Sequence, residues 1–151
     1  MAMMGDFLRN KLVDWILRAQ TYTPPATQYV GLMTTNSTHT VGSGTEVTGG
    51  SYARVAITAS MTATGWAGTQ SAGSTTASSG SGASAVTSNN GTITFPAPTA
   101  NWGVVTGWTI WDASTAGNML FFGPLSVSKT INNGDAAPSF ASGALALTFD
   151  T

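Results

Sequence analysis

The sequence predicts an all-β protein with a single α-helix at its N-terminus. Three observations support this fold class: one early segment has helical periodicity, later segments alternate apolar with small or polar residues, and turns rich in Gly and Asn separate them. Such a pattern is typical of antiparallel β-sandwiches, jelly rolls and barrels. The chain has 151 residues, which is long enough for one domain with a sizeable core.

The helix is predicted to begin near Asp6, which suits the N-cap position. It should end before Thr23-Pro24-Pro25, because the residue before a proline avoids helical backbone angles. Five residues at helical spacing form one apolar face: Leu8, Leu12, Trp15, Ile16 and Ala19. A helix of this length is marginal in water by itself, so this face must dock. Its own β-core and a neighbouring subunit are both open as partners.

Short strands are predicted along the rest of the chain, with a weaker one around Trp66. The segments are Gln28–Thr34, Tyr52–Ala59, Thr92–Phe95, Val104–Trp111, Met119–Gly123, Val127–Ile131 and Ala144–Phe149. In the fourth of these, Trp108 and Ile110 share one face, whereas Val105 and Trp111 share the other. Because both faces are apolar, we expect a central strand that is covered on both sides.

Turn residues separate these strands. Asn90-Gly91 and Asn133-Gly134 are Asn-Gly pairs, which favour tight β-hairpins. Further turns are expected at Gly49-Gly50 and at Ala116-Gly117-Asn118. Turns this short predict antiparallel pairing between neighbouring strands.

A stretch from Gly68 to Ser88 consists almost wholly of Gly, Ser, Ala and Thr, without an aromatic or charged residue. Such a composition is typical of a flexible loop, and an arm that becomes ordered against a neighbouring molecule is the alternative. We therefore expect a helical docking segment at residues 1–22. A β-sandwich domain follows at 23–151 and carries this loop or arm at about 68–90.

Charged residues are rare. Asp, Glu, Lys and Arg make up 7% of the chain and the net charge is −1, whereas an average soluble domain has about 25% charged residues. Between Ala19 and Trp111 only Glu46 and Arg54 are charged. A surface with so little like-charge repulsion tends to associate. We therefore expect copies of the chain, or another protein, to cover it.

Residues that perform catalysis or hold cofactors are scarce. There is no cysteine, the one histidine (His39) lies in a polar loop, and the carboxylates are scattered singly. Five basic residues do not form the footprint that nucleic acid requires, and no apolar run is long enough to span a membrane. We predict neither an enzyme nor a cofactor, metal, nucleic-acid or membrane site. Four tryptophans are expected to pack in a core or interface rather than line a sugar-binding cleft: Trp66, Trp102, Trp108 and Trp111.

Several blocks of the sequence resemble a known family. They are Thr21–Leu32, Gly44–Arg54, Phe95-Pro96, Asn101-Trp102-Gly103, Trp111-Asp112-Ala113, Gly117–Gly123 and Lys129–Asp135. These blocks are similar to those of small tailed-phage virion proteins, which are often labelled tail-fibre proteins. Similar small proteins lie on phage capsids as jelly-roll cement subunits. The resemblance implies a virion structural protein with a jelly-roll-like sandwich, and it supplies no catalytic residues. The Gly68–Ser88 stretch looks longer than the family's usual connection.

We therefore expect a cement or decoration protein that binds the outer capsid surface and stabilises contacts between capsomers. Its expected partners are the major capsid protein and copies of itself, as a trimer or a dimer, after synthesis in the host cytoplasm. The expected interface residues are Leu8, Leu12, Trp15 and Ile16 on the helix, with Gly68, Ser74 and Ser81 on the arm. The alternative is a tail-fibre or receptor-binding accessory subunit that contacts host glycans.

Overall fold

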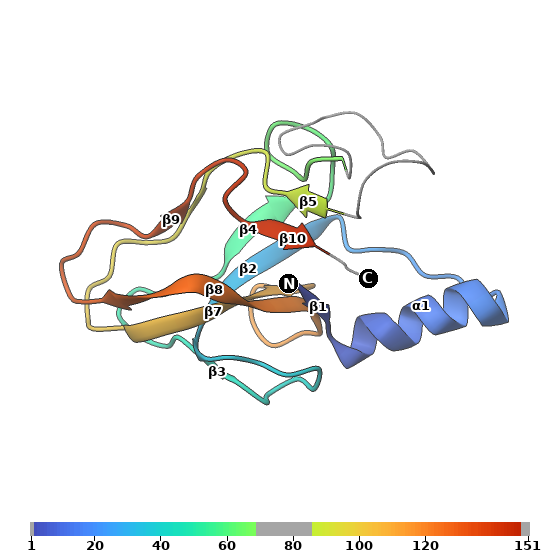
Figure 1. Ribbon diagram of the computed structural model, residues 1–151, viewed down its shortest axis with the longest axis horizontal. Helices are drawn as coiled ribbons and strands as arrows, with labels where there is room; N and C mark the ends of the chain where they lie inside the picture. The colour runs from blue at the N-terminus through green and yellow to red at the C-terminus, as the bar shows by residue number, and fades with distance from the viewer. Residues whose placement is uncertain (1, 69–85, 149–151) are drawn as a thin grey trace.

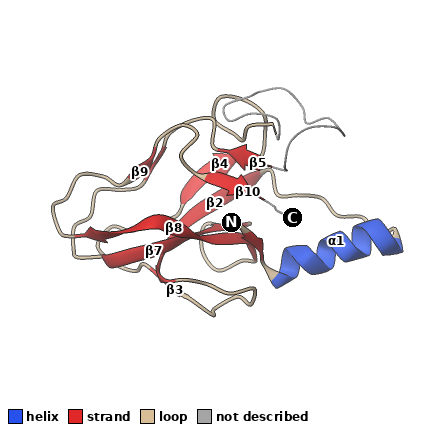
Figure 2. Cartoon of the chain, viewed as in Figure 1, coloured by secondary structure: helices blue, strands red, loops and turns tan. Residues whose placement is uncertain are grey.

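The computed structural model of the protein describes residues 2–68 and 86–148. Regular structure is mainly antiparallel β, with one helix near the N-terminus (Figure 1, Figure 2). The expected all-β sandwich with one helix is therefore confirmed. The elements are β1 (Met3–Met4), α1 (Asp6–Arg18), β2 (Thr27–Thr35), β3 (Thr45–Glu46), β4 (Val55–Thr58), β5 (Val86–Ser88), β6 (Ile93–Thr94), β7 (Gly103–Trp111), β8 (Met119–Ile131), β9 (Ser139–Phe140) and β10 (Ala146–Thr148).

A six-stranded antiparallel sheet forms the larger layer, in the order β1-β8-β7-β2-β3, with β4 also paired to β2. On the outer edge of β2, β4 pairs with Thr27–Val30 and β3 with Met33 and Thr35. The Leu32 amide lies where β4 has ended and β3 has not begun, and it donates to the Tyr52 hydroxyl at 2.8 Å. A side chain thus completes the backbone hydrogen bonding of β2 at this point.

Strand β7 lies at the centre of this sheet, between β2 and β8. Trp108 and Ile110 on one face and Trp111 on the other are all buried, which confirms the expected two-sided burial of this strand. The face predicted for Val105 is wrong. A β-bulge between Val105 and Gly107 shifts the alternation, so Val105 packs in the same core cluster as Trp108.

Two small ladders, β6–β9 and β5–β10, form the second layer over one face of the large sheet (Figure 1). Apolar residues in or beside both layers pack in one cluster, which includes Val30, Leu32, Ile93, Phe95, Trp108, Ile110, Leu145 and Leu147. Each of these side chains is almost completely buried. Burial of apolar surface contributes about 25 cal/mol per Å², so this inter-layer cluster holds the sandwich together.

The turn predicted at Ala116-Gly117-Asn118 joins β7 to β8 as a hairpin. Ala116 and Gly117 both have positive φ, at 51° and 77°. The Asp112 carboxylate accepts hydrogen bonds from the Asn118 backbone amide at 2.6 Å and from the Asn118 side chain at 2.7 Å. Asp112 therefore caps this turn.

The hairpins predicted at the two Asn-Gly pairs are wrong. Strands β5 and β6 flank Asn90-Gly91, but they pair with β10 and β9 rather than with each other, and β8 and β9 likewise do not pair across the second turn. The buried Asn89 explains the first case. Its side-chain nitrogen donates to the carbonyls of Gly91 and Ala141, and its side-chain oxygen accepts from the Leu145 amide. These bonds tie the turn to a distant part of the chain.

The strands of the structure differ from the predicted strands where pairing depends on residues distant in the sequence. Strands β1, β3, β5 and β9 have only two or three residues, and they were not predicted. The two strands predicted at 119–123 and 127–131 form one long strand, β8. The weak strand expected around Trp66 is an isolated bridge between Trp66 and Asn89.

Helix α1 has Gly5 as its N-cap, so the N-cap role predicted for Asp6 is wrong, and Asp6 lies in the first turn instead. Glycine is needed at this position because a Cβ atom on Gly5 would clash with the Met119 carbonyl of β8. The helix ends at Arg18, where Ala19 takes a left-handed conformation with φ of 52°. It therefore stops several residues before the prolines that were expected to end it.

Candidate functional site

The first turns of α1 are anchored on the β-sandwich. Leu8 is buried, and Phe7 and Leu12 are half-buried against the same core cluster. The Asp6 amide donates to the His39 carbonyl at 2.8 Å, which holds the junction between β1 and α1 in place. The base of the helix is therefore part of the folded body.

The last turns of α1 extend beyond the sheets (Figure 1). Four large apolar side chains here are 51–77% exposed: Val13, Trp15, Ile16 and Leu17. We call these four residues the distal apolar cluster. At about 100° per residue they span about 200° of the helix circumference. Grouped apolar side chains at the surface are typical of interaction sites, so this cluster is the candidate functional site.

Four of the five charged residues of α1 form ion pairs within the helix itself. Arg9 lies 3.3 Å from Asp6, and Arg18 lies 2.8 Å from Asp14. Lys11 stands over an aromatic ring of the first turn. Covering the distal apolar cluster therefore requires little desolvation of isolated ions, and the cluster suits a neutral partner surface.

The structure divides the predicted helical interface residues into two pairs. Leu8 and Leu12 face the protein's own core, whereas Trp15 and Ile16 belong to the distal apolar cluster. Sequence reasoning missed the other two members of the cluster, because they do not lie on the stripe of residues at helical spacing. The signal that marks them is the apolar run itself, which surrounds most of the last turns.

Of the predicted arm residues, only Gly68 lies in the described part of the chain. Gly68 is buried where the described segment ends, and Ser74 and Ser81 lie outside the described residues. The end of the same stretch forms β5, which pairs with β10. The structure thus assigns a role in the sandwich to residues 86–88 of this stretch.

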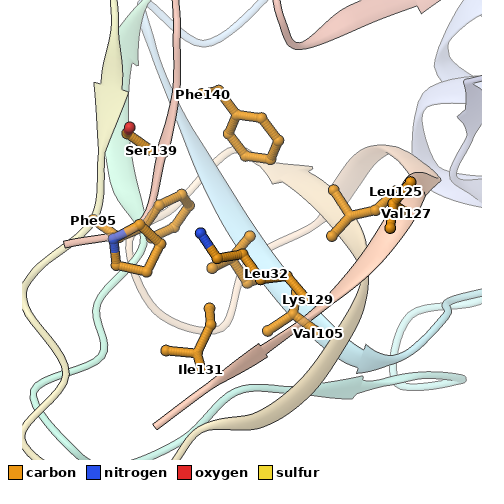
Figure 3. Close-up of a pocket in the computed structure, with 10 residues that line it drawn as sticks. Leu32, Phe95, Val105, Leu125, Val127, Lys129, Ile131, Ser139 and Phe140 are labelled. Atoms are coloured by element: carbon orange, nitrogen blue, oxygen red, sulfur yellow. The ribbon is translucent and has the colours of Figure 1, made fainter. Parts of the chain in front are cut away.

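An apolar groove lies between β8 and the second layer (Figure 3). Its cavity of about 170 Å³ is lined from both layers, by Leu32, Phe95, Val105, Leu125, Val127, Lys129, Ile131, Pro138, Ser139 and Phe140. The adjoining edge of β8 carries features that discourage the addition of a strand. Pro124 lacks an amide hydrogen, Lys129 is charged, and a register shift leaves residues 125–128 out of the ladder with β7.

The two isolated charges of the central sequence, Glu46 and Arg54, form one ion pair in the structure. The Arg54 guanidinium donates to both Glu46 oxygens, at 2.8 and 2.7 Å, and its side chain is only 7% exposed. It also donates to the carbonyls of Ala113 and Ala116 at 2.9 Å and lies 3.8 Å from the centroid of the Trp111 ring. Arg54 thus connects the β3–β4 region to the β7–β8 hairpin.

Tyr52 joins this ion pair to the sheet. Its hydroxyl donates to Glu46 at 2.8 Å while accepting from the Leu32 amide. Burial raises the pKa of Tyr52 far above its ordinary value, and the nearby Glu46 charge raises it further. The network of Glu46, Tyr52 and Arg54 therefore joins strands β2 and β3 to the β7–β8 hairpin.

The described residues do not bring together groups suited to metal chemistry. In residues 2–68 and 86–148, no three His, Cys, Asp or Glu side chains are placed to hold a metal ion. His39 instead hydrogen bonds through Nδ1 to the Met4 carbonyl and packs edge-on against Phe122. None of the helices described is long and apolar enough to cross a membrane.

Comparison with protein families decides the family to which this chain belongs. The model of the family described as Podophage GP4 fiber I protein gp80 matches residues 3–148. The chain belongs to this family. The match includes β1, α1 and both layers of the sandwich, and it confirms the resemblance to small virion proteins of tailed phages. No curated protein matches the chain. As a member of the gp80 fibre family, this chain is a phage virion structural protein.

Proposed function

We propose that this chain is a fibre-type subunit of a tailed-phage virion that attaches through the distal apolar cluster of α1. The family description supports the fibre assignment. The observation that carries the attachment role is the exposure of four large apolar side chains on one projecting helix. An amphipathic helix that presents such residues is a common docking element.

Structural attachment is favoured over recognition of host glycans. Three of the tryptophans considered for a sugar site, Trp102, Trp108 and Trp111, are at most 6% exposed. The Trp66 indole is engaged by Gln28, to which it donates at 2.7 Å. Side chains buried in this way are unsuited to stacking on a sugar ring, so the proposed contact surface is apolar and lies on the helix.

A second candidate function is that of a capsid cement protein bound to the major capsid protein. Its support is the form of the chain, which has one sandwich and one projecting apolar helix and shows no internal sequence repeat of the kind that builds a long shaft. Many weak contacts to a capsid lattice would give strong overall attachment through avidity.

Copy number and location in purified virions distinguish the two functions. A fibre subunit should give a faint band on a stained gel relative to the major capsid protein, and antibody-linked gold should label the tail. A cement protein should give a band comparable to that of the capsid protein, with label over the whole head. A strong band with head label would overturn the fibre proposal.

A further inference from the structure

We infer that the distal apolar cluster of α1 is an interface between copies of this chain, and that each helix contacts more than one neighbouring copy. This inference deepens the proposed function and rests on it for its setting in the virion. It assigns the occupant of an exposed surface, which the proposed function leaves open.

The first argument is the width of the apolar surface. Around the last turns of α1, only Asp14 and Arg18 interrupt the apolar side chains, and these two residues form an ion pair with each other. A helix that packs against a single surface needs an apolar stripe of a little over 100°, whereas the distal apolar cluster covers about 200°. One flat partner therefore leaves part of the cluster in water. Two helices packed on different sides would cover it.

The second argument is charge. A partner with a charged surface would be matched by unpaired charges of opposite sign, as is usual for specific interfaces between different proteins. The ion pairs of α1 are instead satisfied within the helix, at Asp6–Arg9 and Asp14–Arg18. The distal apolar cluster itself carries no charge. A surface that complements it is another uncharged apolar cluster, and other copies of the chain present one.

The third argument is that the helix is pre-formed. The amides of Ala19 and Gln20 both donate to the Asp14 carbonyl, the Gln20 amide at 3.0 Å, and Ala19 has a left-handed conformation. The end of α1 is therefore fixed before any partner binds. Pre-organisation of this kind lowers the entropic cost of association.

The fourth argument is area. Four half-exposed or more exposed apolar side chains offer roughly half of the 800 Å² per partner that a stable two-protein interface buries. A single pairwise contact between two helices would thus be weak. Contacts with two neighbours at once use the whole surface, so the inferred assembly is larger than a dimer.

The test is the mass of the purified full-length chain, measured by sedimentation velocity and multi-angle light scattering at concentrations on the order of 100 µM, well above a micromolar Kd. The wild type should form an assembly larger than a dimer. Leu17→Glu should abolish it, because the glutamate would be buried without a partner. Val127→Glu is the matched control, since Val127 is 78% exposed and Leu17 is 77% exposed. The control should assemble like the wild type, and far-UV circular dichroism should show that both variants fold.

Three results would overturn the inference: a wild type that remains a monomer or a dimer, an assembly that Leu17→Glu leaves intact, or one that Val127→Glu disrupts equally. If the wild type is monomeric while Leu17→Glu prevents incorporation into virions, the occupant is another virion protein, and the inference falls while the attachment proposal stands. If the chain assembles as stated but gold labels the head, the fibre proposal falls and the inference stands.

Discussion

Arg54 shows how strongly one residue can depend on its partner. Glu46→Ala leaves the guanidinium buried beside Trp111 with its charge unmatched. Breaking a buried ion pair in this way costs about 3–5 kcal/mol. We expect the free energy of unfolding to fall by an amount in this range, as measured by urea denaturation monitored by tryptophan fluorescence.

The exposed pair on α1 provides the control for this measurement. Asp14→Ala removes the partner of Arg18, whose side chain is 69% exposed, and exposed pairs contribute only about 0–1 kcal/mol. Equal effects of the two substitutions would contradict the role assigned to the Glu46–Arg54 pair.

Tyr52 should make the protein less stable in alkaline solution. Burial and the Glu46 charge raise its pKa in the folded state, whereas the unfolded value is about 10. The folded protein therefore retains this proton at pH values at which the unfolded chain releases it. The contribution to stability is complete below about pH 10 and decreases as the pH rises above this value. Urea denaturation at a series of pH values measures the decrease.

Tyr52→Phe separates this effect from other alkaline titrations. It should lower stability at neutral pH by about 1–3 kcal/mol, because the Leu32 amide and the Glu46 carboxylate lose a partner. The substitution should also make the free energy of unfolding fall less steeply as the pH rises above about 10. Tyr22→Phe is the comparison, since burial and then Asp112 also raise the pKa of Tyr22. A slope unchanged by Tyr52→Phe would contradict the assignment.

Helix α1 ends on a residue with an unfavourable backbone conformation. Ala19 has φ of 52°, a region that disfavours residues with a Cβ atom by about 1–2 kcal/mol. Ala19→Gly should relieve this cost, and after the greater flexibility of glycine in the unfolded chain is subtracted, a gain of up to about 1 kcal/mol remains. Hydrogen exchange of the amides in the last turn should become slower.

Ala26→Gly is a suitable control for this change. Ala26 lies outside regular structure and is not among the residues with positive φ, so glycine there removes no strain and should not slow exchange in α1. Faster exchange in Ala19→Gly than in the wild type would show that the cap is not strained as described.

Elements with strong local patterns could be predicted from the sequence, and elements defined by distant partners could not. The periodicity at Leu8 and Leu12 marked the helix, and the alternation at Trp108 and Ile110 marked the central strand. Two-residue strands such as β1 and β9 are too short to show a period. Local Asn-Gly chemistry predicted turns, but the pairing around them depends on the long-range hydrogen bonds of Asn89.

The candidate site was predictable in the same partial way. A helical stripe identifies which residues share a face, and it included Trp15 and Ile16, whose side chains are exposed in the structure. It does not show where the supporting sheet ends along the helix. The exposure of Val13 and Leu17 follows from that end point, which is a property of the folded body rather than of the helix.

For the molecule as a whole, the first residues belong to the body as well as to the proposed interface. Deleting residues 1–22 removes β1 from the edge of β8 and takes Leu8 out of the core. Loss of a buried leucine side chain alone costs about 2–5 kcal/mol. We expect the truncated chain to lose its cooperative thermal unfolding transition, or to melt at a much lower temperature, in differential scanning calorimetry.

Leu17→Glu is the counterpart to this truncation, because its side chain is exposed and should leave the melting temperature of the unassociated chain unchanged. A truncated chain as stable as the full-length protein would show that β1 and Leu8 contribute little to the fold.

The ion pairs within α1 have a consequence for how the assembly of the virion depends on salt concentration. Attractions between opposite charges on separate subunits fade in brine, because dissolved ions screen them. Contacts between apolar surfaces do not weaken in this way, and strongly hydrated salts reinforce them. A particle joined through such a helix should therefore remain assembled at both low and high ionic strength.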